Sequence, residues 1–254
     1  MEASIAIPRP ELEARAERLR SYAEEQGLSG IVLFDNAYIL YVSGFAFIPT
    51  ERPMVFVIGA RGERALFVPR LEVEHARVQT GYARVESYPE YPSQRHPMER
   101  LQEMLDDMGI GGRYGADTDG YPWILGYRGP ALTELLGGEL VRVSGFVEDL
   151  MAIKSERELA LIRESAKWGN LAHRLLQRYT AVGETETEVS MQATNEATLT
   201  MLDTLGHLYR AQATFSRGAS AGYRGQIGRN SAIPHAMANN ITFQPGDVLV
   251  TGAG

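Results

Sequence analysis

The sequence predicts an α/β fold over residues 1–150, a mixed sheet with helices packed on it, followed by a helix-led α+β module over residues 151–254. In the first part, apolar runs of strand length alternate with stretches of helical periodicity. In the second part, two sequences that initiate helices follow one another closely. No repeat, low-complexity tract or flexible linker separates the parts, and we expect the boundary near Leu150.

The composition is that of a globular protein. The chain has 254 residues, with 44% hydrophobic and 22% charged residues, enough for one large or two ordinary domains. It has no cysteine, which excludes disulfides, thiolate metal sites and cysteine nucleophiles. The net charge of -7 gives no overall attraction to nucleic acid or anionic lipid. Without a signal-like or membrane-spanning apolar run, we expect a cytoplasmic protein with neither nucleic-acid nor membrane partners.

Periodicity gives the order of elements in the first part. Apolar residues from Leu12 to Ala23 recur at helical spacing, and Gly27 ends that pattern. A second helix is expected over 97–108, and another helical stretch lies between the last two strands of this part. Turn-forming residues at 59–62 make a hairpin of the strands on either side. The expected strands are 30–34, 54–58, 65–68, 85–88, 112–117 and 140–143.

Two capping boxes open the helices of the second part. The Ser155 side chain can accept a hydrogen bond from the Glu158 amide, while the Glu158 carboxylate reaches back to the Ser155 amide. Thr185 and Glu188 repeat the pattern and start a helix that should run to about Leu202. Paired helices of this kind distinguish the second part from the strand-rich first part.

After these helices the sequence predicts short strands and loops. A strand is expected over 208–215. The glycine-rich stretch 218–229 is interpreted as a loop that borders a substrate, because a phosphate-binding loop would be followed by a helix and here a strand is expected. Residues 244–247 form a turn, and the last strand begins at Val248.

His235 is the histidine with a context for chemistry. It follows a stretch of turn-forming residues, 228–234, just before a predicted strand, and loops on a rigid sheet often carry binding groups. An imidazole there can accept a proton near neutral pH or donate to a substrate carbonyl. The alternative is a histidine with a structural role. The other histidines are interpreted as surface residues: His75, His96, His173 and His207.

At His235 the sequence resembles a known family. Residues 228–235, followed by 244–250, resemble the creatinase, prolidase and aminopeptidase P family. Residues 153–163 look like the helix that opens that family's second domain. Residues 36–45 resemble a strand-to-helix segment of its first domain, and Glu51-Arg52-Pro53 (51–53) follows at a familiar distance. Each match is short, but together they lie in the right order along nearly the whole chain.

The resemblance implies an amino-terminal α/β domain and a carboxy-terminal pita-bread domain made of two related halves. Residues 1–150 would form the creatinase-type N-terminal domain, and residues 151–254 the first half of the pita-bread catalytic domain, which stops midway. His235 falls on the family histidine that binds the scissile group in the peptidases and serves as the acid–base residue in creatinase.

The resemblance also implies a departure at the metal site. The family peptidases bind two divalent metals, typically Mn, Co or Zn, through two aspartates, a histidine and two glutamates. Gly252 stands about where the first aspartate should be, and the other four ligands would lie beyond Gly254. Glycine offers no side-chain oxygen to a hard cation. We therefore expect no metal and no other cofactor in this stretch of the protein.

Four further residues each have two interpretations. Arg224 and Arg229 are candidates to bind a substrate carboxylate, or they are solvated. Tyr38 borders a site across the interface of the homodimer expected of the full-length protein, or it packs in a core. Asp247 substitutes as a metal ligand, or it caps its own turn, as aspartate does through local backbone hydrogen bonds.

The expected function is an Xaa-Pro peptidase-type hydrolase of a peptide or related C–N bond, present here as a fragment that is inactive alone. Gly252 favours one alternative, a metal-free creatinase-like amidinohydrolase with a guanidino-type substrate in place of a small peptide. The alternative of another class is a non-catalytic binding module on the same fold. A histidine and two glutamates downstream of Gly254 would indicate a peptidase.

Overall fold

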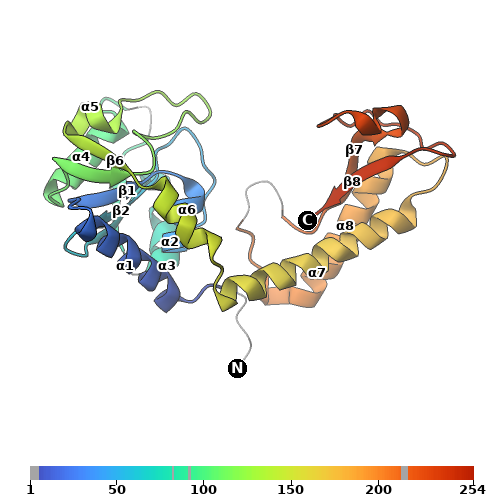
Figure 1. Ribbon diagram of the computed structural model, residues 1–254, viewed down its shortest axis with the longest axis horizontal. Helices are drawn as coiled ribbons and strands as arrows, with labels where there is room; N and C mark the ends of the chain where they lie inside the picture. The colour runs from blue at the N-terminus through green and yellow to red at the C-terminus, as the bar shows by residue number, and fades with distance from the viewer. Residues whose placement is uncertain (1–5, 82, 91–92, 213–216) are drawn as a thin grey trace. The chain divides into compact units, whose positions relative to one another are not determined.

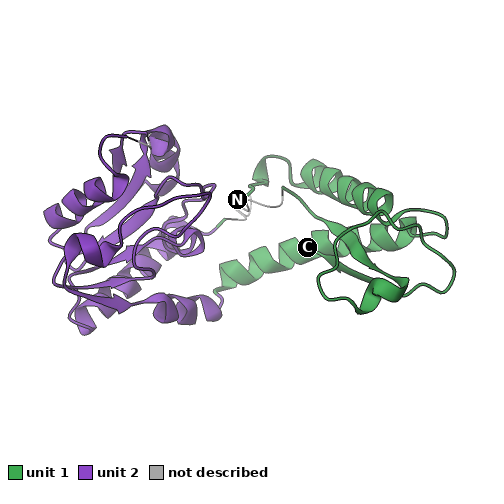
Figure 2. Ribbon diagram, turned by 90° about the horizontal axis from the view of Figure 1, so that it is seen from above, with its two compact units in different colours: residues 1–6, 155–254 green, residues 7–154 purple. Residues whose placement is uncertain are grey.

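The computed structural model describes residues 6–81, 83–90, 93–212 and 217–254. The chain divides into two compact units (Figure 2), an N-terminal unit of Ile7–Lys154 and a C-terminal unit of Ser155–Gly254 with Ala6. The expected boundary near Leu150 falls inside helix α6 (Ser144–Ala152), whose Val147 is buried in the core of the N-terminal unit. Within the described ranges, no helix is long and apolar enough to cross a membrane.

The N-terminal unit is built on a six-stranded sheet with the order β4-β3-β2-β1-β5-β6; Figure 1 labels β1, β2 and β6 of this sheet. β1 pairs antiparallel with β2 and parallel with β5, and β2 pairs antiparallel with β3. The outer pairs, β3–β4 and β5–β6, are parallel. The predicted mixed sheet is confirmed. Its strands are β1 (Gly30–Leu33), β2 (Val55–Gly59), β3 (Arg64–Pro69), β4 (Arg84–Tyr88), β5 (Arg113–Ala116) and β6 (Glu139–Arg142).

Helices cover both faces of this sheet. Successive residues of β1 point to opposite faces, so that Ile31 and Leu33 enter one core while Val32 enters the other. The first core is closed by α6 and by α1 (Arg9–Glu25), α2 (Asn36–Ser43) and α3 (Val73–Thr80). The second core is closed by α4 (Pro97–Asp107) and the short α5 (Leu132–Leu136).

A buried carboxylate ties β5, β1 and α2 together. Asp117 directly follows β5, is 4% exposed, and accepts hydrogen bonds from the backbone amides of Phe34, Asp35 and Thr118 at 2.7–3.0 Å. Asp35 in turn caps the first turn of α2. Burial raises the pKa of Asp117 to about 6, in opposition to the three amide donors, which lower it.

The C-terminal unit places two long helices against a two-stranded antiparallel sheet. Both predicted helix starts are confirmed. Ser155 and Glu158 form both halves of their capping box. Thr185 caps the next helix through the Glu188 amide, while its hydroxyl donates to the Glu188 carboxylate. The elements are α7 (Glu156–Tyr179), α8 (Glu186–Leu205), β7 (Ala221–Ile227) and β8 (Leu249–Ala253).

Side chains of α8 cover the edge of β7 that β8 leaves free. Side chains at every fourth position of α8 bond to backbone groups at every second position along β7 and the short stretch before it. Four helix residues rise about 6.0 Å and two strand residues about 6.6 Å, so the two rows stay in register. We call this row the α8–β7 ladder. Its pairs are Glu186–Gly225, Ser190–Tyr223, Thr194–Ala221 and Thr198–Ala219.

Two predictions about the residues around β7 are wrong. Residues 206–208 form a 3-10 helix and residues 209–212 have no regular structure, where a strand over 208–215 was expected; residues 213–215 lie outside the described residues. The edge of β7 that such a strand could use is already occupied by α8. The stretch 218–229, expected to be a loop, instead contains β7, because Ala221, Tyr223 and Ile227 alternate into the core.

Replacing Thr194 by valine tests the ladder. The Thr194 hydroxyl donates to the Ala221 carbonyl at 3.1 Å and accepts from its amide at 3.3 Å. Thr194→Val keeps the shape but leaves both backbone groups without this partner, so the free energy of unfolding should fall by about 1–3 kcal/mol. The chain has two tryptophans, of which Trp123 lies in the N-terminal unit and Trp168 in the C-terminal unit. In a Trp123→Phe background, urea unfolding followed by Trp168 fluorescence therefore reports on the C-terminal unit.

Thr200→Val is the matched control. The Thr200 side chain is exposed and bonds only the Glu196 carbonyl of its own helix among the described contacts. Its loss should change the unfolding free energy by less than about 0.5 kcal/mol. Equal effects of the two valine substitutions would show that the ladder does not stabilise the unit.

The pKa of Asp117 predicts a pH dependence of stability. The folded protein, with a pKa of about 6, binds this proton more tightly than an aspartate at its ordinary 3.8. This tighter proton binding adds to the free energy of unfolding. The contribution is fully present below about pH 4 and is lost as the pH rises through about 6. The ¹³C NMR shift of the Asp117 carboxyl should titrate near pH 6, and Asp117→Asn should remove this part of the pH dependence. A midpoint below about 4 would mean that the hydrogen bonds from the three amides lower the pKa of Asp117 more than burial raises it.

Candidate functional site

The segment that carries His235 leaves the end of β7 and is held by backbone contacts. It begins with the 3-10 helix η3 (Gly228–Ala232). The Gly228 amide donates to the Val248 carbonyl at 2.9 Å, which joins this end of the segment to the start of β8. The Gln226 side chain donates to the Ile233 carbonyl at 3.1 Å. These bonds place the turn at His235 on one end of the small sheet.

His235 itself is exposed and has a strained backbone. Together with Pro234 it forms a turn in which the His235 side chain is solvent-accessible. Its φ angle is +55°, in the left-handed region that non-glycine residues rarely occupy. Such strain persists only where the surrounding structure fixes the backbone, and it is concentrated at functional sites.

The two candidate arginines lie on different elements. Arg224 is on β7, is exposed, and lines a hollow of about 460 Å³ between α8 and the ends of β7 and β8. Arg229 is exposed in η3. Within the described chain, neither Arg229 nor His235 is among the residues that line this hollow. The structure therefore places Arg224 at the hollow and the other two on the neighbouring segment.

Tyr38 belongs to the N-terminal unit. It lies on α2, half-buried against the core of that unit. Its hydroxyl donates to the Glu148 carboxylate of α6 at 2.6 Å. Burial, and then this hydrogen bond, raise the pKa of the Tyr38 phenol. In the structure Tyr38 thus connects two helices of its own unit.

The residues around the last strand do not by themselves fit a two-metal site. Asp247 caps its turn, as the second interpretation predicted: its carboxylate accepts from the Gln244 amide at 2.8 Å. Gly252 on β8 pairs with Gly222 and brings no ligand atom. Across the described ranges, no group of three or more histidines, aspartates or glutamates lies close enough together to hold a metal ion.

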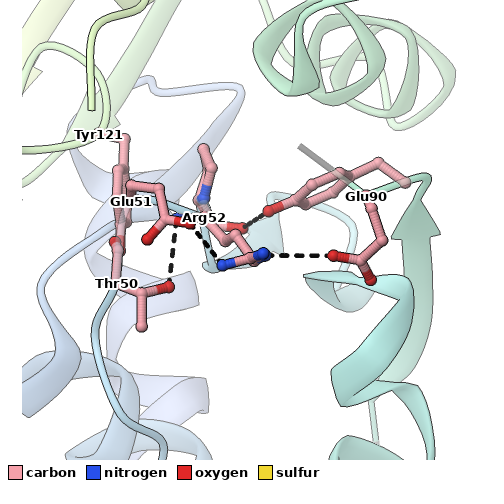
Figure 3. Close-up of polar contacts among 7 residues, drawn as sticks. Thr50, Glu51, Arg52, Glu90 and Tyr121 are labelled. Carbon is pink, nitrogen blue, oxygen red and sulfur yellow. Dashed lines mark hydrogen bonds and ion pairs between the residues drawn. The ribbon is translucent and has the colours of Figure 1, made fainter. Parts of the chain in front are cut away.

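The N-terminal unit has a polar cluster of its own, on the irregular segment between α2 and β2 (Figure 3). The Arg52 guanidinium contacts the Glu51 carboxylate at 2.5 Å and the Glu90 carboxylate at 3.1 Å. The Tyr121 hydroxyl donates to the Thr50 carbonyl at 2.8 Å. The Glu51-Arg52-Pro53 sequence, singled out by its resemblance, therefore forms a corner fixed by ion pairs and a buried tyrosine.

In the C-terminal unit, Glu186 is a buried residue that the capping pattern of the sequence did not point to. It lies between the capping residues Thr185 and Glu188, is fully buried, and its carboxylate bonds three backbone amides. A signal was present: polar residues at 186, 190, 194 and 198 form a row beside the apolar row at 189, 193, 197 and 201. Such a row on a buried face needs hydrogen-bond partners.

Comparisons with known proteins agree with this architecture. A relative of Bacillus subtilis (strain 168), described as the uncharacterized peptidase YqhT, is 25% identical over 247 residues, which covers 94% of this chain and 60% of the relative. The Xaa-Pro dipeptidase structure from Bacillus anthracis superposes with a TM-score of 0.70 at 23% identity, over 95% of this chain and 61% of that one. The dipeptidase PepE structure from Mycobacterium ulcerans gives 0.70 at 21% identity, over 98% and 62%.

These structural likenesses show a shared fold, and the chain spans about 60% of the length of the proteins that it matches. The sequence model of the creatinase/prolidase N-terminal domain matches residues 15–153, more than half of the chain and nearly all of the N-terminal unit. The chain therefore belongs to the creatinase/prolidase N-terminal domain family.

Proposed function

We propose that this chain is part of a peptidase-type hydrolase that cleaves an Xaa-Pro peptide bond, with His235 contacting the scissile group. The family match and the relatives described as peptidases support the reaction class. The observation that carries the assignment to this chain is the exposed His235 with its left-handed backbone, on a segment held at the end of the small sheet.

The proposed roles follow from side-chain chemistry. An exposed imidazole can donate a hydrogen bond to the substrate carbonyl as negative charge develops on its oxygen, or exchange a proton with the reacting groups. Arg224 and Arg229 are proposed to bind the carboxylate of a small peptide, for which a guanidinium offers two parallel donors. The C-terminal unit would be the first half of a pita-bread catalytic domain, inactive alone. The whole protein would act as a cytoplasmic homodimer, in which Tyr38 borders the partner's site.

Gly252 favours a second candidate, a metal-free hydrolysis of a C–N bond in a guanidino-type substrate. The resemblance places a metal-binding aspartate at this position of the strand, and glycine supplies no oxygen there. The two candidates share the role of His235 and differ in substrate. Turnover of a guanidino compound without added metal, with no turnover of Xaa-Pro dipeptides, would favour the second.

Replacing His235 by alanine tests the proposed chemistry. In the full-length protein, His235→Ala should lower kcat for Xaa-Pro dipeptide hydrolysis by about 10²-fold or more, as for loss of a general acid–base group. Arg18→Ala is a control on an exposed residue of the N-terminal unit. Unchanged turnover in His235→Ala would remove this residue from the reaction, and peptide binding without any turnover by the wild type would indicate a binding module.

Replacing His235 by glycine tests the strain. A left-handed backbone costs a non-glycine residue about 1–2 kcal/mol, whereas glycine carries an entropic penalty of about 0.5–1 kcal/mol on folding. His235→Gly should therefore raise the free energy of unfolding by about 0.5–1 kcal/mol, while His235→Ala stays within about ±0.5 kcal/mol because the side chain is exposed. Urea unfolding followed by Trp168 fluorescence measures both. A loss of stability in the glycine variant would contradict a strained native backbone.

A further inference from the structure

Glu186 is a buried carboxylate whose described hydrogen bonds all go to backbone amides. It is the first residue of α8 and is 0% exposed. Its Oε2 accepts from the Gly225 amide at 2.6 Å, and its Oε1 accepts from the amides of Asn239 at 2.7 Å and Ile241 at 3.3 Å. A carboxylate is costly to bury unless such donors satisfy it. Both oxygens are therefore committed to these contacts.

The three amides lie on either side of the segment that carries His235. Gly225 precedes residues 226–238, and Asn239 and Ile241 follow them. The two ends of the segment also lie in direct contact, since a Cβ added at Gly225 would lie 2.1 Å from the Met237 carbonyl oxygen. Gly225 has a φ of +76°. One carboxylate thus bonds both ends of a compact loop at the point where they meet.

The start of this segment is tied down by the bonds from Gly228 to Val248 and from Gln226 to Ile233, but the part that carries His235, residues 232–238, has few buried contacts. Residues 232–235 and 237–240 are exposed, and Met237 is 84% exposed. A segment with few buried contacts depends on its anchored ends for order. Nevertheless His235 keeps a left-handed backbone, which needs a constraint from its surroundings.

We propose that Glu186 is a positioning residue for His235. Its carboxylate holds the two ends of segment 226–238 together and so determines where the imidazole lies. Because Glu186 is fully buried, it acts through the segment and does not touch a substrate. The role in turnover rests on the proposed function of His235, whereas the hold on the segment does not.

The test is a Glu186→Gln variant of the full-length protein. A glutamine offers one acceptor oxygen and one NH₂ donor, so whichever way it is turned, a donor faces the amides at one end of the segment. Thr198→Val is the matched control, because it breaks the α8–β7 ladder at its other end, at Ala219, and leaves the segment untouched. Glu186→Asp is the second variant: its carboxylate is one methylene shorter and cannot reach both ends.

The first readout is the order of the backbone, measured by ¹⁵N NMR relaxation of residues 232–238, the exposed part of the segment. In Glu186→Gln, and in Glu186→Asp if the glutamine variant does not fold, the order parameters should fall from about 0.85 to below about 0.6. In Thr198→Val they should stay at the wild-type value. A segment that stays rigid in both Glu186 variants, or that loosens equally in Thr198→Val, would overturn the proposal.

The second readout is the hydrolysis of an Xaa-Pro dipeptide. Glu186→Gln should lower kcat by about 10- to 100-fold, the effect of a small misplacement of a reacting group, with KM changed less than about threefold. In a His235→Ala background the same substitution should lower kcat by less than about twofold, because the group that it positions is gone. An equal loss in both backgrounds would overturn the positioning role. If His235→Ala alone has no effect, the proposed function fails, and the NMR comparison decides whether Glu186 holds the segment.

Discussion

The C-terminal unit depends on the hydrogen bonds by which α8 covers one edge of β7. A two-stranded sheet is marginal by itself, and backbone groups along a covered edge need partners. A helix can supply them only if its side chains meet every second strand residue, which the similar rises of four helix residues and two strand residues allow. The ladder from Glu186 to Thr198 does this. It fixes β7, and β7 fixes Gly225 and the start of the segment that carries His235.

Each unit uses a buried carboxylate to organise backbone amides where a strand gives way to another element. Asp117 holds the start of α2 beside the end of β5, and Glu186 holds both ends of the segment after β7. In both places the donors are amides fixed by the fold, so no cation has to be buried with the carboxylate. Burial weakens the charged form, as the raised pKa of Asp117 shows. A carboxylate buried in this way needs its amide donors, so it favours the arrangement of the chain that brings those amides to it.

Local signals predicted most of the fold, and non-local contacts account for the errors. The apolar runs that became β1 and β2 lie in a sheet covered on both faces, and Ser155 starts α7 as its capping box predicts. β7 was missed because Gly222 and Gly225 resemble loop residues; they are tolerated because α8 comes close to the strand and one position needs a positive φ. His235 was singled out through its surrounding motif, and its functional role stays a prediction. Glu186 was not singled out, because its partners lie 39 to 55 residues away.

In this chain of the creatinase/prolidase N-terminal domain family, an exposed histidine with a left-handed backbone lies on the segment that follows β7. The central claim is that a peptide substrate meets the chain at His235. The most direct measurement is an NMR titration of the His235 imidazole in the full-length protein with a slowly hydrolysed Xaa-Pro dipeptide analogue. The account predicts a saturable shift of the His235 ring signals, together with shifts of the Arg224 or Arg229 guanidinium. Saturable binding that moves signals elsewhere and leaves His235 unchanged would contradict it.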